Sequence, residues 1–385
     1  MKFSHSSVTS NRAPSEVTVI GGSAAGLFSA YLLAKEGVKV QLFDSNDVMN
    51  MTSRTLIVTS GLCDALGFSP ADGIVNEIRD IHLYAPNQEA RVALREPDLI
   101  VERAAIVKLL AQKAIDAGVE IHSKTRLLGL RPSKDGAVAT LRNSKTAETF
   151  EVESRTVIGA DGASSMVGKL AHKQSLETVP LLQAIVKLPE GAPRSLTNVW
   201  FRPEDTPYFY WMIPHSDTEA ALGFIAEDGR GAWDKLARFV KQLGLKYGEI
   251  QGSRIPLYSN RVCASTRFGA SDVYCVGDAA AQVKVTTVGG LVTGLRGAKA
   301  AVGQILGNGF SGESRELRRE LDVHQKMRRV LNKFQEADYD HLVGMLNGRL
   351  RGLLAEYNRD QLVRFAFKLV FAQPRLLRFA SLLLR

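Results

Sequence analysis

A glycine-rich turn between an apolar segment and a helix, close to the N-terminus, places the strongest constraint on the fold of this chain. Residues 16–20 are β-prone, residues 21–26 read Gly-Gly-Ser-Ala-Ala-Gly, and an Ala- and Leu-rich helical pattern follows to residue 36. A second apolar segment, residues 38–43, ends at Asp44. This order predicts a βαβ unit whose helix N-terminus holds a pyrophosphate while Asp44 holds a ribose hydroxyl.

Within this turn, each small residue has an expected task. Gly21 permits the sharp bend and Gly26 lets the helix pack closely on the sheet. Ser23 stands where the usual G-x-G-x-x-G pattern has its middle glycine, and it is small enough for a phosphate to approach the backbone. The residues that we expect to bind the dinucleotide here are Gly21, Ser23, Ala24, Ala25, Gly26 and Asp44.

Two later segments have the same strand-to-turn form. Residues 273–276 are apolar and lead into Gly277-Asp278, and Gly289-Gly290 then opens an Ala-rich helix that starts near Leu291. Residues 156–158 lead into Gly159-Ala160-Asp161-Gly162. Alone, each of these turns is more often structural, but three such turns in one chain predict a shared ligand.

Together the three turns resemble the FAD-dependent flavoprotein family that includes p-hydroxybenzoate hydroxylase. The resemblance implies FAD as cofactor, with the ADP half on the first turn and the ribityl chain on Asp278. It also implies that the turn at Asp161 lies beside both nucleotide-binding regions and that Arg103, at the head of a predicted helix, belongs to the site. The cofactor residues that this resemblance adds are Arg103, Asp161, Asp278, Gly289, Gly290 and Leu291.

Within that family, residues 279–295 resemble the geranylgeranyl reductase branch, in which a Lys, two Thr and a glycine cluster follow the Gly-Asp turn. Residues 208–214 with Gly223 resemble the aromatic Y-x-W-x-F-P signature of the same branch. The branch usually has Pro at the position of Val285 and Gly at the position of Val288. The resemblance runs from about residue 17 to residue 301 and implies hydride transfer from reduced FAD to carbon–carbon double bonds of an isoprenoid lipid.

The substrate of such an enzyme needs an apolar tunnel, because an isoprenoid chain has no polar groups along its length. Candidates for its lining are Tyr208, Tyr210, Trp211, Met212 and Ile213, and Lys284 from the glycine segment is a further candidate for substrate binding. Strand alternation lets only part of this set face one side. The aromatic motif is also close to the W-x-W-x-I-P of flavin-dependent halogenases, so a monooxygenase or halogenase that acts on an aromatic substrate is the alternative.

The composition indicates which classes of binding partner the protein has. The formal net charge is +9, yet no nucleic-acid motif accompanies it, so we expect no nucleic acid partner. The basic, aromatic-rich residues 361–385 fit either an anionic membrane surface or a pair of helices packed on the body. The sequence contains no second glycine fingerprint for a nicotinamide. It therefore does not decide whether the external electron donor is a reduced nicotinamide or ferredoxin.

The compartment follows from what the sequence contains. Three cysteines form no C-x-x-C pair, which indicates a reducing environment without a metal site. No long apolar run suggests a signal peptide or a transmembrane helix. We therefore expect a cytoplasmic protein, and the basic tail adds a peripheral position at the inner face of the membrane as an option.

The motifs divide the chain into a Rossmann-type α/β FAD-binding domain, an inserted antiparallel β-sheet substrate domain and a helical C-terminal region. The first domain is discontinuous and takes residues 16–80, 100–176 and 261–310. The substrate sheet takes residues 81–99 and 177–260, and the helical region takes residues 311–385. A disordered leader, residues 1–15, precedes them.

Overall fold

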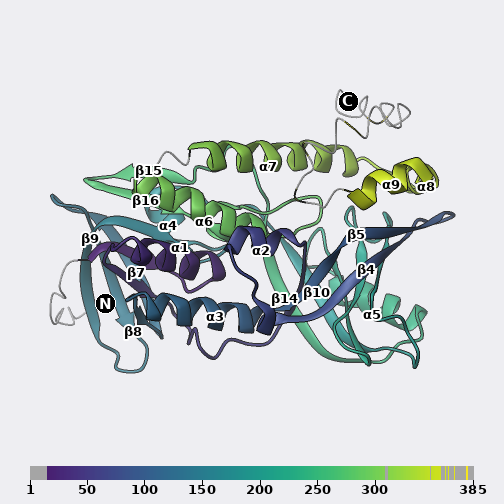
Figure 1. Ribbon diagram of the computed structural model, residues 1–385, viewed down its shortest axis with the longest axis horizontal. Helices are drawn as coiled ribbons and strands as arrows, with labels where there is room; N and C mark the ends of the chain where they lie inside the picture. Colours follow the sequence, from purple (N-terminus) through teal and green to yellow (C-terminus); the bar gives the residue numbers. More distant parts are fainter. Residues whose placement is uncertain are drawn as a thin grey trace.

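The computed structural model describes residues 15–307, 311–346 and 348–356, together with Asp360, Val363, Lys368 and Phe379. Two β-sheets lie side by side along the long axis, with helices across them (Figure 1). The predicted α/β architecture with a helical C-terminal region is confirmed. Residues 1–14 of the predicted disordered leader lie outside the described residues.

The first sheet has the strand order β15-β16-β9-β1-β2-β6, and β7 and β8 extend it through β9. Strand β1 runs parallel to both β2 and β9, as a βαβ unit requires. The strands are β1 (Ser15–Ile20), β2 (Val40–Phe43), β6 (Glu120–His122), β7 (Thr125–Pro132), β8 (Ala137–Asn143), β9 (Thr149–Gly159), β15 (Ser265–Phe268) and β16 (Ser271–Cys275).

Three helices share the apolar core of this sheet: α1 (Ala24–Lys35), α3 (Arg103–Asp116) and α6 (Leu291–Ile305). Their fully buried side chains include Leu27, Leu110 and Leu295. The strands β1 and β2 are apolar on both faces, because helices pack on one side and the β7–β8–β9 layer packs on the other. A short helix, α4 (Met166–Ala171), follows β9.

The second sheet has the order β14-β10-β13-β12-β11-β4-β5-β3, and its pairs are antiparallel except for β11 with β4. Helix α5 (Ala232–Gln242) packs on one face. The strands are β3 (Thr55–Val58), β4 (Ile74–Tyr84), β5 (Glu89–Glu102), β10 (Thr178–Lys187), β11 (Leu196–Trp200), β12 (Tyr210–Pro214), β13 (Glu219–Ile225) and β14 (Tyr247–Pro256).

The structure differs from the expected domain boundaries at residues 80 and 99. Residues 55–80, which we expected in the FAD-binding domain, supply β3 and the first part of β4 to the second sheet. The expected boundaries at residues 80 and 99 each fall inside a continuous strand. A strand keeps its ladder partners along its whole length, so both β4 and β5 belong to the second sheet.

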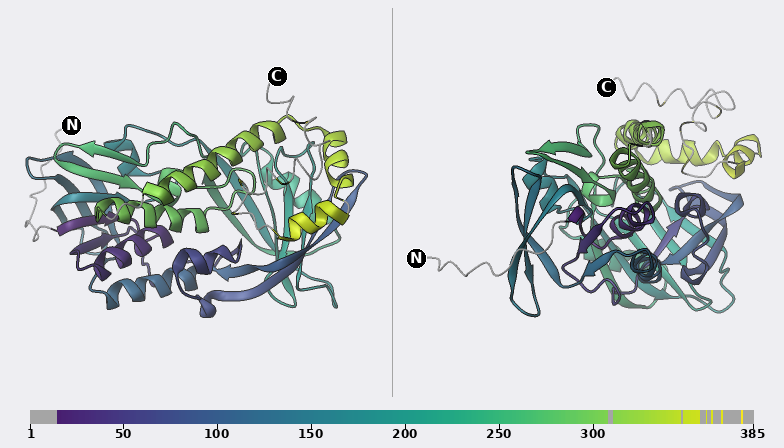
Figure 2. Two further views of the ribbon diagram at one scale, coloured as in Figure 1. Left: turned by 45° about the horizontal axis from the view of Figure 1, so that its top comes forward. Right: turned by 60° about the vertical axis from the view of Figure 1, so that its left-hand side comes forward.

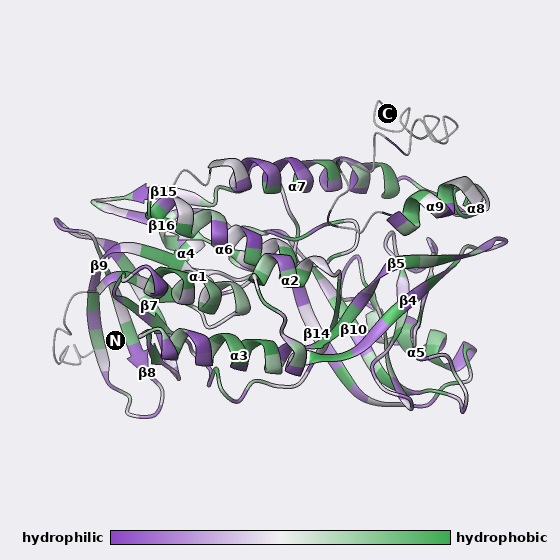
Figure 3. Cartoon of the chain, viewed as in Figure 1, coloured by the Kyte–Doolittle hydropathy of each residue, from purple (hydrophilic) through white to green (hydrophobic). Residues whose placement is uncertain are grey.

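The C-terminal helices lie over both sheets. Helix α7 (Ser311–Leu331) packs on α6 and extends toward the second sheet, where α8 (Glu336–Gly344) and α9 (Gly348–Glu356) follow (Figure 2). Helix α7 is strongly hydrophilic along much of its length (Figure 3). Most of the basic tail 361–385 lies outside the described residues. No helix in the described ranges has the length and hydropathy needed to cross a membrane.

Candidate functional site

The turn between β1 and α1 is built so closely that only glycine fits. Gly21 has φ +109°, and a Cβ placed on it would lie 2.3 Å from the carbonyl oxygen of Ala160. A Cβ on Gly26 would lie 2.1 Å from the carbonyl oxygen of Gly21. Ser23 caps α1, where its hydroxyl accepts a 3.3 Å hydrogen bond from the Gly26 amide. The sequence therefore positions a helix N-terminus at the carboxyl end of β1, with Ala24 and Ala25 in its first turn.

Asp44 lies at the end of β2, beside the same turn. Its carboxylate accepts hydrogen bonds of 2.5 Å from the Gly22 amide and 2.6 Å from the Asn46 amide. It remains half-buried, so one side of the carboxylate still faces outward. The structure thus brings Asp44 to the place that a ribose hydroxyl would need, and its binding role remains a prediction.

The last turn places Asp278 between two arginines. Burial raises the pKa of the Asp278 carboxyl, while the nearby positive charges of Arg103 and Arg54 lower it. Burial also lowers the pKa of Arg54, and repulsion from Arg103 adds to this effect. The prediction for Arg103 placed it in this region. Arg54 was missed because it lies in a short loop that contains no motif.

Helix α6 begins directly opposite this carboxylate. Its N-cap is Gly290, which provides no capping side chain, and a Cβ on Gly290 would come within 3.2 Å of the Asp278 Oδ1. The first backbone amides of α6, from Leu291 onward, therefore remain available to a ligand. A Cβ on Gly294 would lie 3.1 Å from the Gly277 Cα, which shows how closely α6 packs on the turn.

The two nucleotide helices meet at this point. A Cβ on Gly277 would lie 3.1 Å from the Cβ of Ala25 in the first turn of α1. The N-termini of α1 and α6, each with a partial positive charge, thus converge at the carboxyl ends of the parallel strands β1 and β16. This is the arrangement in which a pyrophosphate and the polar edge of a flavin ring find donors without further side chains.

The middle turn, at Asp161, packs against the glycine turn. The Asp161 carboxylate accepts hydrogen bonds of 2.5 Å from the Ser165 hydroxyl and 2.6 Å from the Met166 amide. It therefore caps α4, and its turn contacts the glycine turn through Ala160 and Gly21. Direct cofactor binding by Asp161 remains a prediction.

Residues 284–290 form a closed loop in front of α6. The Lys284 carbonyl accepts hydrogen bonds of 2.7 Å from the Val288 amide and 3.1 Å from the Thr287 amide, and the Lys284 amide donates to the Gly289 carbonyl over 3.1 Å. Val288 has φ +51°, a left-handed conformation that strains a β-branched residue. This explains why a glycine is usual at the position in the branch that the sequence resembles.

Lys284 itself is buried and ion-paired. Its ammonium donates to the carboxylate of Asp360, which also accepts from the Thr59 hydroxyl. Asp360 lies 76 residues further along the chain. No sequence motif indicated that it would pair with Lys284. The predicted contact between Lys284 and substrate remains a prediction, since the ammonium already has a carboxylate partner.

The aromatic strand β12 divides its residues between two faces. Tyr210 and Met212 pack in the core against α5, where the ring of Tyr210 stacks on Phe224 at 4.6 Å between ring centroids. Tyr208, which precedes the strand, and Trp211 belong instead to a cluster with Val288. Alternation directs the side chains of Tyr210 and Met212 to the face opposite Val288, and their contacts with substrate remain a prediction.

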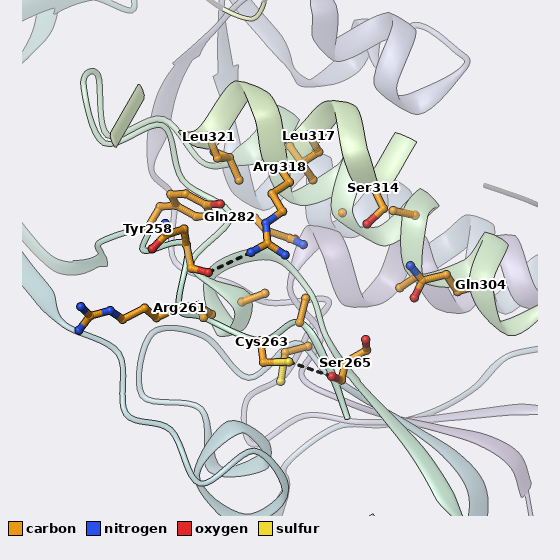
Figure 4. A pocket seen from close by; sticks show the side chains of 18 residues that line it. Tyr258, Arg261, Cys263, Ser265, Gln282, Gln304, Ser314, Leu317, Arg318 and Leu321 are labelled. Atoms are coloured by element: carbon orange, nitrogen blue, oxygen red, sulfur yellow. Dashed lines mark hydrogen bonds between the residues drawn. The ribbon is translucent and has the colours of Figure 1, made fainter. Parts of the chain in front are cut away.

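Two cavities flank the loop that follows β14. The first, about 280 Å³, lies between this loop, α6 and α7 and is lined by Tyr258, Cys263 and Gln282 among others (Figure 4). Arg318 crosses it from α7 and donates to the Asn260 carbonyl over 3.1 Å. The second cavity, about 480 Å³, lies on the other side of Tyr258 and is lined by Tyr208 and Val285.

The observed geometry fits FAD. A glycine cradle without room for a Cβ, two converging helix N-termini and an acidic group at each end match the needs of a dinucleotide. A family model described as "FAD binding domain" matches residues 14–329. The chain therefore belongs to this family of FAD-binding proteins, and its cofactor is FAD.

Two related proteins indicate the class of enzyme to which the chain is similar. The digeranylgeranylglycerophospholipid reductase of Methanocaldococcus jannaschii is 25% identical over 94% of this chain and 97% of its own length. Reductase 1 of that name from Methanothermobacter thermautotrophicus is 26% identical over 75% of this chain and 76% of its own. The chain is thus an FAD-dependent oxidoreductase that resembles geranylgeranyl reductases.

Solved structures agree on the fold. A geranylgeranyl bacteriochlorophyll reductase-like protein from Thermoplasma acidophilum superimposes with a TM-score of 0.74 at 17% identity, over 96% of this chain and 99% of that one. A flavin-dependent brominase gives a TM-score of 0.67 at 16% identity, over 92% and 98%. At these identities both likenesses concern the fold alone.

Proposed function

We propose that the protein reduces carbon–carbon double bonds of a long isoprenoid lipid. The single observation that carries this proposal is the cluster in which Tyr208, Trp211 and Ile213 pack with Val288. It joins the second sheet to the loop in front of α6, so an apolar surface adjoins the flavin site. The names of the curated relatives support the same class of substrate.

In this proposal FAD, once reduced, supplies the hydride. The turns at Gly21 and Asp278 hold the cofactor against the sheet, and the N-terminus of α6 faces it. Trp211 and Tyr208 exclude water from the apolar surface and orient the chain, which has no polar groups of its own by which to be positioned. Each methylene that the surface buries contributes about 0.8 kcal/mol, so affinity should increase with chain length until the surface is filled.

The test is product analysis under anaerobic conditions. The FAD-loaded protein is incubated with a chemical reductant and a series of prenyl lipids of increasing length. We expect each reduced double bond to add two hydrogens to the product, with faster conversion of longer chains. Conversion only of short aromatic compounds, and only with oxygen, would instead support the monooxygenase or halogenase alternative.

The electron donor and the membrane contact belong to the same proposal. A reduced nicotinamide or ferredoxin would reduce the FAD, and the basic tail 361–385 would hold the protein at an anionic lipid surface where such substrates reside. Competition between the two donors for reduction of the bound flavin distinguishes them. Sedimentation with anionic vesicles at low and high salt tests the surface contact.

A further inference from the structure

The 480 Å³ cavity beside Tyr208 contains a buried cation without a carboxylate partner. Arg328, on α7, is only 6% exposed, and its Nε has no hydrogen-bond partner. Among the described residues, the titratable groups that act on its guanidinium are the hydroxyls of Tyr339 and Tyr208, and no carboxylate is among them. Buried charges in proteins are normally paired or bound to a ligand, so this guanidinium marks a candidate site for an anion.

The guanidinium is held in a fixed position. It lies over the ring of Tyr208 at 4.4 Å from the ring centroid, and its Nη2 donates to the Pro207 carbonyl over 2.6 Å. Burial lowers the pKa of Arg328, but an arginine still keeps its charge at neutral pH. A fixed, charged guanidinium on the wall of a cavity is suited to the oxygens of a phosphate.

The rest of the cavity adds positive charge and polar groups. Arg261 and Arg329 are exposed at its rim, while one carboxylate, that of Glu177, also lines it. One face of α7 contributes Gln325, Arg328 and Arg329, at the i, i+3, i+4 spacing of a helix surface, and Asn332 follows directly after the helix. The cavity thus has three arginines against one acidic group.

Its position relates it to the apolar surface at the flavin site. Tyr208 belongs both to the wall of the cavity and to the cluster with Trp211 and Val288. Val285, from the loop in front of α6, lines the cavity from another side. We propose that this cavity binds the phosphate headgroup of the prenyl lipid, with Arg328 as its principal ligand, while the chain extends past Tyr208. This inference rests on the proposed function for the identity of the chain.

The experiment compares equilibrium binding of a prenyl diphosphate and the matching prenyl alcohol to the FAD-loaded full-length protein. We expect the diphosphate to bind at least about tenfold more tightly, as for a charge-assisted contact. Arg328→Gln should reduce this ratio to near one, and Arg261→Gln, at the exposed rim, should reduce it partly. Lys326→Gln, which removes a charge from α7 outside the cavity, should leave it unchanged. Inorganic pyrophosphate alone should raise the melting temperature of the wild type and not of Arg328→Gln.

A ratio of diphosphate to alcohol affinity near one in the wild type would overturn the inference. So would a ratio that neither Arg328→Gln nor Arg261→Gln changes. Binding of pyrophosphate without any preference between the two lipids would indicate a site for free phosphate and would also overturn it. Because binding requires no turnover, the two proposals fail separately. Reduction of prenyl lipids without headgroup preference would refute the anion site alone. Headgroup-dependent binding without reduction would refute the proposed function alone.

Discussion

The nucleotide turns and the strand β12, whose Trp211 face we propose to meet the substrate, are held in place by different contacts. At Gly21 and Gly26 the backbone itself fills the space, and a single added carbon would lie within 2.3 Å of a carbonyl oxygen. At β12 the positions depend on which face each side chain packs against. Substitutions in the turns should therefore remove the cofactor site, whereas substitutions on the strand should change selectivity.

The largest expected effect is that of Gly21→Ala. The new Cβ would collide with the Ala160 carbonyl and the backbone would have to leave φ +109°, so we expect a loss of about 4 kcal/mol or more in unfolding free energy. Gly37→Ala is the matched control, because Gly37 also has a positive φ but nothing lies within 4 Å of its Cβ position. That control should lose only about 1–2 kcal/mol. Equal losses in chemical denaturation would show that the close approach at Gly21 is unimportant.

The next largest effect is the difference between substitutions on the two faces of β12. Tyr210→Leu should lower the unfolding free energy by about 2 kcal/mol or more, because it removes a fully buried stacked ring. It should leave the ratio of rates for long and short prenyl chains unchanged. Trp211→Leu, on the opposite face, should change that ratio. A change of ratio in the Tyr210 variant but not in the Trp211 variant would reverse the assignment of the two faces.

Asp278→Asn should separate cofactor affinity from stability. We expect FAD affinity to fall by roughly tenfold to a hundredfold, the effect of losing one charge-assisted hydrogen bond. The pKa of Asp278 is raised because burial outweighs the two arginines. A raised pKa means that the ionised form destabilises the fold, and that stability falls as pH rises through this pKa. The melting temperature of the FAD-free variant at neutral pH should therefore not fall below that of the wild type, and a clear fall would contradict this account.

The smallest expected effect is a difference in stability between two substitutions at Val288, in the loop in front of α6. Val288→Gly and Val288→Ala both remove the branched methyl groups, but only glycine adopts φ +51° without strain. The glycine variant should therefore be more stable than the alanine variant by about 1 kcal/mol. Thermal unfolding of the two FAD-loaded variants measures this difference, and an alanine variant that is equally stable would show that the loop relaxes.

The turns were predictable from sequence because each depends on residues close together in the chain, such as Gly21 and Gly26 around one helix start. The strand β12 was predictable as a strand, but its phase was not. Only contact with α5 decides that Tyr210 faces the core and Trp211 faces the flavin loop. Arg54, Arg328 and Asp360 were missed since each reaches its site from a distant part of the chain. The boundary at residue 80 was wrong because β4 continues through it.

The most direct test of the central claim, that an apolar substrate surface adjoins the flavin, is anaerobic reoxidation of the reduced protein. The FAD-loaded chain is reduced, freed of excess reductant and mixed with a long prenyl lipid while the visible absorbance of oxidised flavin is followed. The account predicts that the absorbance returns with the lipid, more slowly in Trp211→Leu, and that it does not return with the fully saturated lipid. Absorbance that returns only when oxygen is admitted would contradict it.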